Sequence, residues 1–194
     1  MIEELFSRFD GAFSENTLRA YHSDFRQYES WCSSENQTSL PATADLIAEY
    51  VDFMATQNKS ATIRRRINSL GTIFKLSKHP DPTKEPEVVL ALKRMHRKIG
   101  RQQKQATPLT KEILDQLLEK CDDGTRGLRD QVLLRLGYET MRRRSEICSF
   151  TFDDLTEIPR RGPAIRLVKS KTDQEGSSKL IPISQGLVDL ILTW

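Results

Sequence analysis

The chain has 194 residues, 29% of them charged and 37% hydrophobic, which fits one or two globular domains with cores of their own. No stretch approaches the roughly 18 consecutive apolar residues of a membrane span, and the acidic N-terminus lacks the apolar segment of a signal peptide. The three cysteines lie far apart and form neither a disulfide framework nor a metal-ligand spacing, so we expect a cytoplasmic protein without metal or cofactor.

The net charge of +3 is unevenly distributed along the chain. Residues 1–58 carry 3 Lys/Arg against 10 Asp/Glu, a balance of −7. Residues 59–104 carry 13 against 3, a balance of +10, and residues 105–194 carry 14 of each. A basic block of this size inside a weakly basic chain indicates a polyanionic partner.

Helical periodicity dominates the first half of the chain. After a short amphipathic N-terminal piece, apolar residues recur at helical spacing in segments separated by polar or proline-containing stretches. Ser14 or Asn16 is the expected N-cap of the first long helix, and Thr43 or Asp45 that of the next. The predicted helices cover about residues 14–32, 43–54, 60–78 and 88–99.

The helix predicted at residues 60–78 has an apolar side and a cationic, hydroxyl-rich side. The polar side carries Arg64, Arg65, Arg66, Asn68, Ser69 and Lys75. Such a face is typical of a helix that lies against a DNA backbone or groove, although a solvated basic face explains the pattern equally well. The candidate DNA contacts of the first half, expected to touch mostly phosphates, are Arg19, Thr62, Arg64, Arg65, Ser69 and Lys75.

Residues 101–108 are polar and basic and have almost no apolar content. We interpret them as an extended interdomain linker. The first domain, residues 1–100, is then an all-helical bundle that binds DNA, and a second domain spans residues 109–194.

The second domain is predicted to begin with helices that open at Thr110 and near Arg129. The later helix runs into three consecutive arginines at residues 142–144, and a further helix is expected to begin near Ser145, a good N-cap residue. An arginine at such a junction presents a rigid, always-charged fork to a phosphate, and Glu146 is well placed to orient it. The alternative is a solvated cluster at a helix end, favoured by the helix dipole.

The period changes after these helices. Two short β-like runs, residues 164–168 and 179–183, flank a polar loop and predict an antiparallel hairpin or part of a three-stranded sheet. Ser184 is expected to cap a last helix. The sequence stops at Trp194 inside an apolar helical pattern, from which we expect a truncated chain or a broken reading frame.

In the order of these features the chain resembles the tyrosine recombinases, or phage integrase family, and Cre-like members in particular. The first half is similar to the core-binding domain, and the second to the opening of the catalytic domain. The family signature of Arg, any residue, Ser or Ala, Glu and an aliphatic residue matches residues 143–147. The resemblance implies a mainly α fold: an all-helical, SAM-like domain followed by part of an α+β catalytic domain with a small antiparallel sheet.

The resemblance also implies roles for particular residues. Arg143 matches the first catalytic arginine, Glu146 the acid that supports it, and Lys171 the hairpin lysine, with Lys169 as a close alternative. Met141 departs mildly from the family, which usually has Gly or a small apolar residue there. Family members cut a DNA strand by attack of a tyrosine on a phosphodiester, form a 3′-phosphotyrosine link and need no metal. An arginine stabilises the charged transition state and a lysine protonates the leaving oxygen.

The family's second arginine, its His-rich signature and its nucleophilic tyrosine lie beyond the part of the fold that this sequence covers. None of the tyrosines Tyr21, Tyr28, Tyr50 and Tyr138 stands in the nucleophile's place. We therefore expect this polypeptide to bind DNA without breaking it. The partners implied for the intact protein are double-stranded DNA with inverted half-sites and further copies of itself, as a tetramer on paired sites, with no membrane.

Two other functions remain open from the sequence. The first is a non-catalytic DNA-binding or regulatory protein derived from a decayed recombinase. The second is a helical protein-interaction module, which explains the apolar stripes but leaves the balance of +10 in residues 59–104 unexplained.

Overall fold

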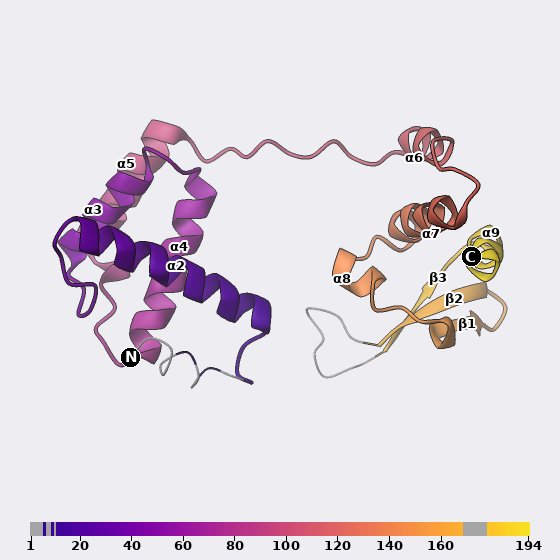
Figure 1. The fold of residues 1–194 in the computed structure, drawn as a ribbon, viewed down its shortest axis with the longest axis horizontal. Coiled ribbons are helices and arrows are strands. Elements are labelled where there is room, and N and C mark those ends of the chain that lie inside the picture. The colour runs from indigo at the N-terminus through magenta and orange to yellow at the C-terminus, as the bar shows by residue number, and fades with distance from the viewer. Residues whose placement is uncertain (1–5, 7–8, 10, 169–177) are drawn as a thin grey trace. The chain divides into compact units, whose positions relative to one another are not determined.

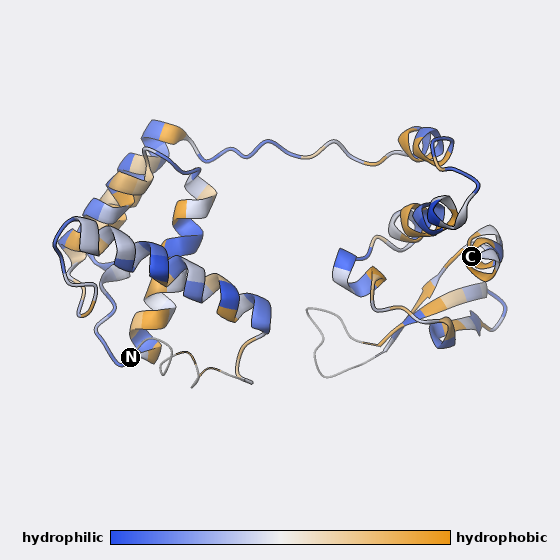
Figure 2. Cartoon of the chain, viewed as in Figure 1, coloured by the Kyte–Doolittle hydropathy of each residue, from blue (hydrophilic) through white to orange (hydrophobic). Residues whose placement is uncertain are grey.

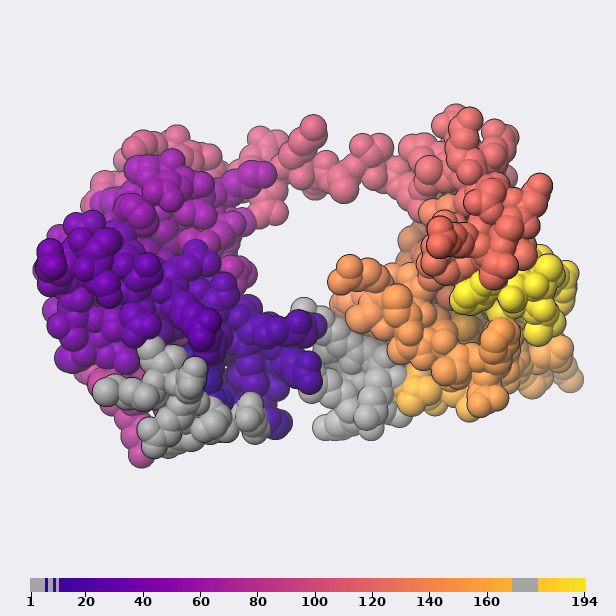
Figure 3. Space-filling model, in the orientation of Figure 1, coloured from indigo at the N-terminus to yellow at the C-terminus, as the bar shows by residue number. Residues whose placement is uncertain are grey.

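A computed structural model describes residues 6, 9, 11–168 and 178–194 of the chain (Figure 1). The chain divides into two compact units, residues 1–105 and 106–194, and each has a hydrophobic core of its own. The boundary falls within the stretch that the sequence analysis interprets as a linker. Residues 101–110 form neither helix nor strand and are exposed, and in the space-filling view this stretch is a single extended thread of residues (Figure 3).

The described part of the first unit is all-helical, as predicted. Its elements are α2 (Glu15–Ser34), α3 (Ala44–Met54), α4 (Ser60–Leu76), the short 3-10 turn η1 (Pro82–Lys84) and α5 (Pro86–Ile99). The side chains of Ser14 and Thr43 accept hydrogen bonds from backbone N–H groups in the first turns of α2 and α3, so these residues, of the alternatives considered, are the N-caps.

The core of the first unit forms where α3 packs against α5 and α2 against α4. Apolar and polar residues alternate around α4 and α5, as their colours show (Figure 2), and the apolar sides face inward. The largest fully buried side chains here include Phe25, Tyr28, Tyr50 and Phe74. The aromatic rings meet edge to face, for example Tyr28 with Tyr50 at 5.2 Å between ring centroids.

The second unit is an α+β arrangement. Its elements are α6 (Lys111–Leu118), α7 (Thr125–Thr140), α8 (Arg144–Ile147), η2 (Phe152–Asp154), β1 (Leu155–Ile158), β2 (Gly162–Leu167), β3 (Lys179–Pro182) and α9 (Gln185–Thr193). The strands form an antiparallel sheet in the order β1-β2-β3, in which Ile165 of β2 lies opposite Leu155 and Ile181. This confirms the three-stranded alternative.

The core of the second unit lies between the sheet and the helices α7 and α9 (Figure 1). Val132 and Leu136 of α7, Leu187 of α9 and Ile165 of β2 are buried together there. Glu139 near the end of α7 accepts hydrogen bonds from the backbone N–H and the hydroxyl of Ser184, at 2.7 and 2.8 Å. Ser184 in turn caps α9, as predicted, so the end of α7 and the start of α9 are held together.

Two features of this unit differ from the sequence-based expectation. Helix α7 begins at Thr125, a full turn before Arg129, because Asp122 accepts a hydrogen bond from the N–H of Gly124, the N-cap, and closes the preceding turn. Strand β1 was not predicted, because its four residues carry no clear alternation and become a strand by pairing with β2.

No helix in the described part of the chain is long and apolar enough to cross a membrane.

Candidate nucleic-acid interface

Among the described residues of the first unit, the most buried charged group is the carboxylate of Asp24, on the inner side of α2. Asp24 is fully buried, and it accepts two hydrogen bonds from the guanidinium of Arg65, at 2.5 and 2.9 Å, and one from the hydroxyl of Ser69, at 2.8 Å. A buried carboxylate is costly unless it is paired and hydrogen-bonded, so Asp24 ties α2 and α4 together in one geometry.

Arg65 lies between this buried acid and solvent. Its side chain is 51% exposed although one edge of the guanidinium is engaged by Asp24. A hollow of about 400 Å³ lies beside it, lined by Tyr21, Ala61, Arg64, Arg65, Asn68, Ser69 and Thr72. Of these described lining residues two are arginines and none is an acid, so the hollow attracts anions.

The expectation that Ser69 lies on the exposed side of its helix is wrong. Its residue is 4% exposed, and its hydroxyl donates to Asp24 and lies 3.1 Å from the backbone oxygen of Arg65. A small hydroxyl next to a buried carboxylate satisfies one of its lone pairs, which is why a polar residue is tolerated at this inward position.

The other predicted contacts of the first unit lie at or near its surface. Arg19 is exposed and donates to Asn16, at 2.9 Å, and Arg64 is exposed on α4. Thr62 is half-buried in the first turn of that helix. Lys75 is exposed at the other end, where its ammonium lies 3.2 Å from the carboxylate of Asp81.

The candidate catalytic arginine of the second unit lies at the junction of α7 and α8. Helix α7 ends at Met141, which adopts the left-handed conformation with φ 50° and ψ 35°. Arg143 follows in an extended conformation as the N-cap of α8. The helix therefore begins with Arg143 as its cap and not with Ser145.

Glu146 determines where α8 begins. Its buried carboxylate accepts the backbone N–H of Arg143 at 3.2 Å and the Nη1 of the same residue at 2.8 Å. The Arg143 side chain remains 52% exposed. This pairing supports the expectation that Glu146 orients the arginine, because one carboxylate fixes both the backbone and the guanidinium of Arg143.

The three consecutive arginines differ in their surroundings. Arg142 donates from its Nε to the backbone oxygen of Thr140, at 2.9 Å, and so helps to close the end of α7. Arg143 is held by Glu146, as described above, whereas Arg144 is exposed in the first turn of α8. Arg143 thus differs from Arg142 and Arg144 in that a buried acid holds its guanidinium.

The predicted catalytic lysine belongs to a different segment from the arginines. Lys171 and its alternative, Lys169, both lie outside the described residues. Among the residues that are described, no group of three or more His, Cys, Asp or Glu side chains is arranged to hold a metal ion.

Two tyrosines of the first unit have perturbed hydroxyl groups. Tyr28 and Tyr50 are buried, and burial raises the pKa of both phenols above the ordinary value. The Arg66 guanidinium opposes this rise in the pKa of Tyr50. A phenol buried in this way is a poor nucleophile, because it does not ionise readily.

Sequence reasoning missed Asp24, and it placed Arg66 on the polar side of its helix without naming it as a contact. A signal for Asp24 was present, because it falls on the inner side of α2 beside Phe25 and three residues after Tyr21. An acid inside an apolar stripe is costly to bury, and its presence there indicates a cationic partner on another element.

Comparison with known proteins identifies the family of the chain. Residues 5–79 match the family described as phage integrase, N-terminal SAM-like domain. The chain is 32% identical to the integrase/recombinase xerD homolog of Selenomonas ruminantium, over 91% of this chain and 52% of that protein. It is 30% identical to tyrosine recombinase XerC of Staphylococcus carnosus, over 74% of this chain and 47% of that protein.

Two further similarities are more distant. Tyrosine recombinase XerD of Vibrio vulnificus is 23% identical over 93% of this chain and 56% of that protein. The crystal structure of XerA recombinase covers all of this chain and 63% of its own, with 16% identity and a TM-score of 0.37. The chain spans about half the length of the curated relatives it matches.

The chain thus combines an all-helical first unit with an α+β second unit in which Glu146 holds Arg143. The chain belongs to the tyrosine recombinases. The relatives named above are Xer proteins, and the likeness to Cre-like members in particular stays a prediction.

Proposed function

We propose that this chain supplies the DNA-binding unit and the first active-site arginine of a site-specific DNA recombinase. The observation that carries the proposal is the similarity to an integrase/recombinase xerD homolog over 91% of the chain, across both units. The proposal extends beyond that similarity, because the chain covers 52% of the relative.

DNA binding is assigned to the basic side of the first unit. The supporting observations are the balance of +10 in residues 59–104 and the hollow beside Arg65, whose described lining contains no acid. We assign phosphate contacts to Arg19, Thr62, Arg64, Arg65 and Lys75. Ser69 supports Arg65 through Asp24 instead of contacting DNA. Phosphate contacts position a duplex without reading its sequence, so the affinity should depend steeply on salt.

The chemistry is assigned to the second unit. In the proposed reaction a tyrosine hydroxyl gives its proton to a base, and its oxygen attacks the phosphorus and forms a 3′-phosphotyrosine bond. The bond from phosphorus to the 5′ oxygen breaks, and the 5′ oxygen takes a proton from Lys171 or Lys169. Arg143 stabilises the extra negative charge on the phosphate in the transition state. The support is the Arg143–Glu146 pair, which holds a guanidinium at the surface by a buried carboxylate.

We further propose that the 194-residue polypeptide binds DNA but does not cut it. Tyr28 and Tyr50 are buried, which argues against either as the nucleophile. The test is incubation with supercoiled DNA that contains the gene's own flanking sequence, followed by denaturing electrophoresis. We expect a mobility shift under native conditions and no covalent protein–DNA adduct. An adduct would overturn this part of the proposal.

The partners of the intact protein are proposed to be inverted half-sites on duplex DNA, bound by four copies on paired sites. Footprinting of the intact gene product on its flanking DNA tests this, and protection of two inverted segments is the expected result. If the intact gene product binds DNA and forms no adduct, the non-catalytic regulator is favoured. If neither it nor the 194-residue polypeptide binds DNA at low salt, the helical interaction module is favoured.

A further inference from the structure

Asp24 lies between two adjacent arginines of α4, and it bonds to them unequally. Oδ1 accepts Nη2 of Arg65, and Oδ2 accepts Nη1 of Arg65 and the hydroxyl of Ser69. The Nε of Arg66 lies 3.8 Å from Oδ1, which is an ion pair but too long for a hydrogen bond. This Nε is buried and has no hydrogen-bond partner among the described residues. Two guanidinium groups therefore share one carboxylate and leave one positive charge uncompensated.

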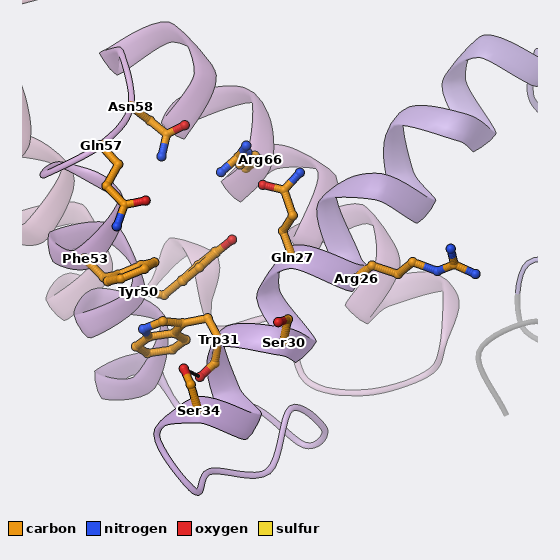
Figure 4. A pocket seen from close by; sticks show the side chains of 10 residues that line it. All are labelled: Arg26, Gln27, Ser30, Trp31, Ser34, Tyr50, Phe53, Gln57, Asn58 and Arg66. Atoms are coloured by element: carbon orange, nitrogen blue, oxygen red, sulfur yellow. Dashed lines mark hydrogen bonds between the residues drawn. The ribbon is translucent and has the colours of Figure 1, made fainter.

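The two arginines line different hollows. Arg65 lines the hollow described above, with Tyr21, Arg64 and Asn68. Arg66 lines a second hollow of about 470 Å³ between α2, α3 and α4 (Figure 4). Consecutive residues of a helix point about 100° apart, so neighbours on α4 reach opposite sides of the crossing with α2.

The second hollow has an aromatic floor and a polar, cationic wall. Trp31 and Tyr50 form much of the floor, with ring centroids 4.9 Å apart. The guanidinium of Arg66, the hydroxyl of Tyr50 and the amide of Gln27 gather at one end, whereas Arg26 extends away from them (Figure 4). None of the described residues that line this hollow is acidic, so its net charge is positive. Such a lining fits a phosphate group better than a cation.

We propose that Asp24 is a positioning residue that directs Arg65 and Arg66 to two separate phosphates of a DNA backbone. Arg66, with the neighbouring amide of Gln27, is the additional phosphate contact, in the hollow of Figure 4. This inference rests on the proposed DNA-binding function and adds a geometry to it. The guanidinium of Arg65 is held on one edge by the buried acid and keeps its remaining donors in a fixed direction, which reduces the entropy lost on binding. Arg66 is held near the same acid by the ion pair alone.

Removing the charge of Asp24 tests the inference, because positioning and general electrostatic attraction predict opposite changes in the affinity for DNA. Asp24→Asn makes the first unit more positive by one charge, and general electrostatic attraction would then tighten binding to DNA. If Asp24 instead positions the arginines, its loss should weaken binding to DNA, because Arg65 and Arg66 lose the acid that directs them. Arg65→Lys gives a second contrast, since it keeps the charge but loses the two-pronged hydrogen bond to Asp24.

The experiment is a titration of the full chain onto a fluorescein-labelled DNA duplex, followed by anisotropy at several salt concentrations. Phosphate contacts are independent of sequence, so any duplex serves. We expect Asp24→Asn to weaken binding about tenfold and Arg65→Lys about fivefold. Arg66→Gln should lower the slope of log K against log salt by roughly 0.9, the contribution of one phosphate. The control, Glu49→Gln, removes an exposed acid from α3 and should leave the affinity unchanged or slightly higher.

A second variant protects the test against loss of fold. Circular dichroism of each variant shows whether the helices are retained. If Asp24→Asn is unfolded, the variants Arg65→Lys and Ser69→Ala test the inference in its place. Ser69→Ala removes one hydrogen bond to Asp24 without a change of charge, and it should weaken binding severalfold. Folded variants that bind as tightly as the wild type would overturn the inference. A wild-type chain that does not bind DNA would instead overturn the proposed function.

Discussion

Glu146 holds Arg143 at two points, since it accepts both the backbone N–H and the guanidinium of the arginine while itself buried in the second unit. Asp24 holds Arg65 in the first unit in a comparable way. In both places a half-exposed arginine is anchored by a carboxylate that is excluded from solvent. A charge at the surface gains a defined direction when its partner lies in the interior, because the pair moves only if the core moves.

Glu146→Gln should lower the stability of the second unit. The amide keeps an acceptor for the N–H of Arg143 but loses the ion pair with its guanidinium. We expect the free energy of unfolding in urea to fall by about 1–2 kcal/mol, a figure kept low because Arg143 is half-exposed and solvent screens its charge. Glu119→Gln removes an exposed acid of the same unit and should have no comparable effect. Equal stability of the two variants would contradict the role given to Glu146.

Met141→Gly should raise stability. Met141 has φ 50° at the end of α7, a conformation that disfavours side chains with a Cβ and is usually taken by glycine. The side chain is 69% exposed, so little apolar burial is lost. We expect a gain of roughly 1 kcal/mol in urea unfolding. Met141→Ala retains a Cβ and serves as the control, and it should give no such gain.

Gly127→Ala should destabilise the second unit. A Cβ built on Gly127 would lie 1.7 Å from the backbone oxygen of Asp122, which a helix start cannot accommodate without moving the preceding turn. We expect a loss of more than about 2 kcal/mol in urea unfolding. The same change at Gly186, where the nearest atom is the Nη1 of Arg135 at 3.7 Å, tests the role of the local contact. Gly186→Ala should be neutral or mildly stabilising, because alanine favours the helix.

The first unit should lose stability in acid partly through Asp81. Burial alone would raise the pKa of this carboxyl, but hydrogen bonds from Thr83 and the ammonium of Lys75 lower it overall. A lowered pKa in the folded state means that the contribution is present above the pKa of the unfolded chain and is lost as the pH falls through the folded value. Asp81→Asn should therefore flatten the fall in stability below about pH 4. Unfolding curves measured from neutral pH downward check this, and parallel curves for the two proteins would contradict it.

The helices of the first unit could be predicted because their causes are local. Apolar spacing and the caps at Ser14 and Thr43 act over a few residues, so the sequence carries them in full. The motif at residues 143–147 is likewise local, and its acid lies one helical turn from the arginine that it holds. Asp24 and Arg65 are instead 41 residues apart. Their pairing, the burial of Ser69 and the two hollows beside α4 arise where α2 crosses that helix, and the strand β1 exists because β2 pairs with it. These features depend on how separate segments pack. The periodicity of one segment does not determine which side chains of another segment will lie against it.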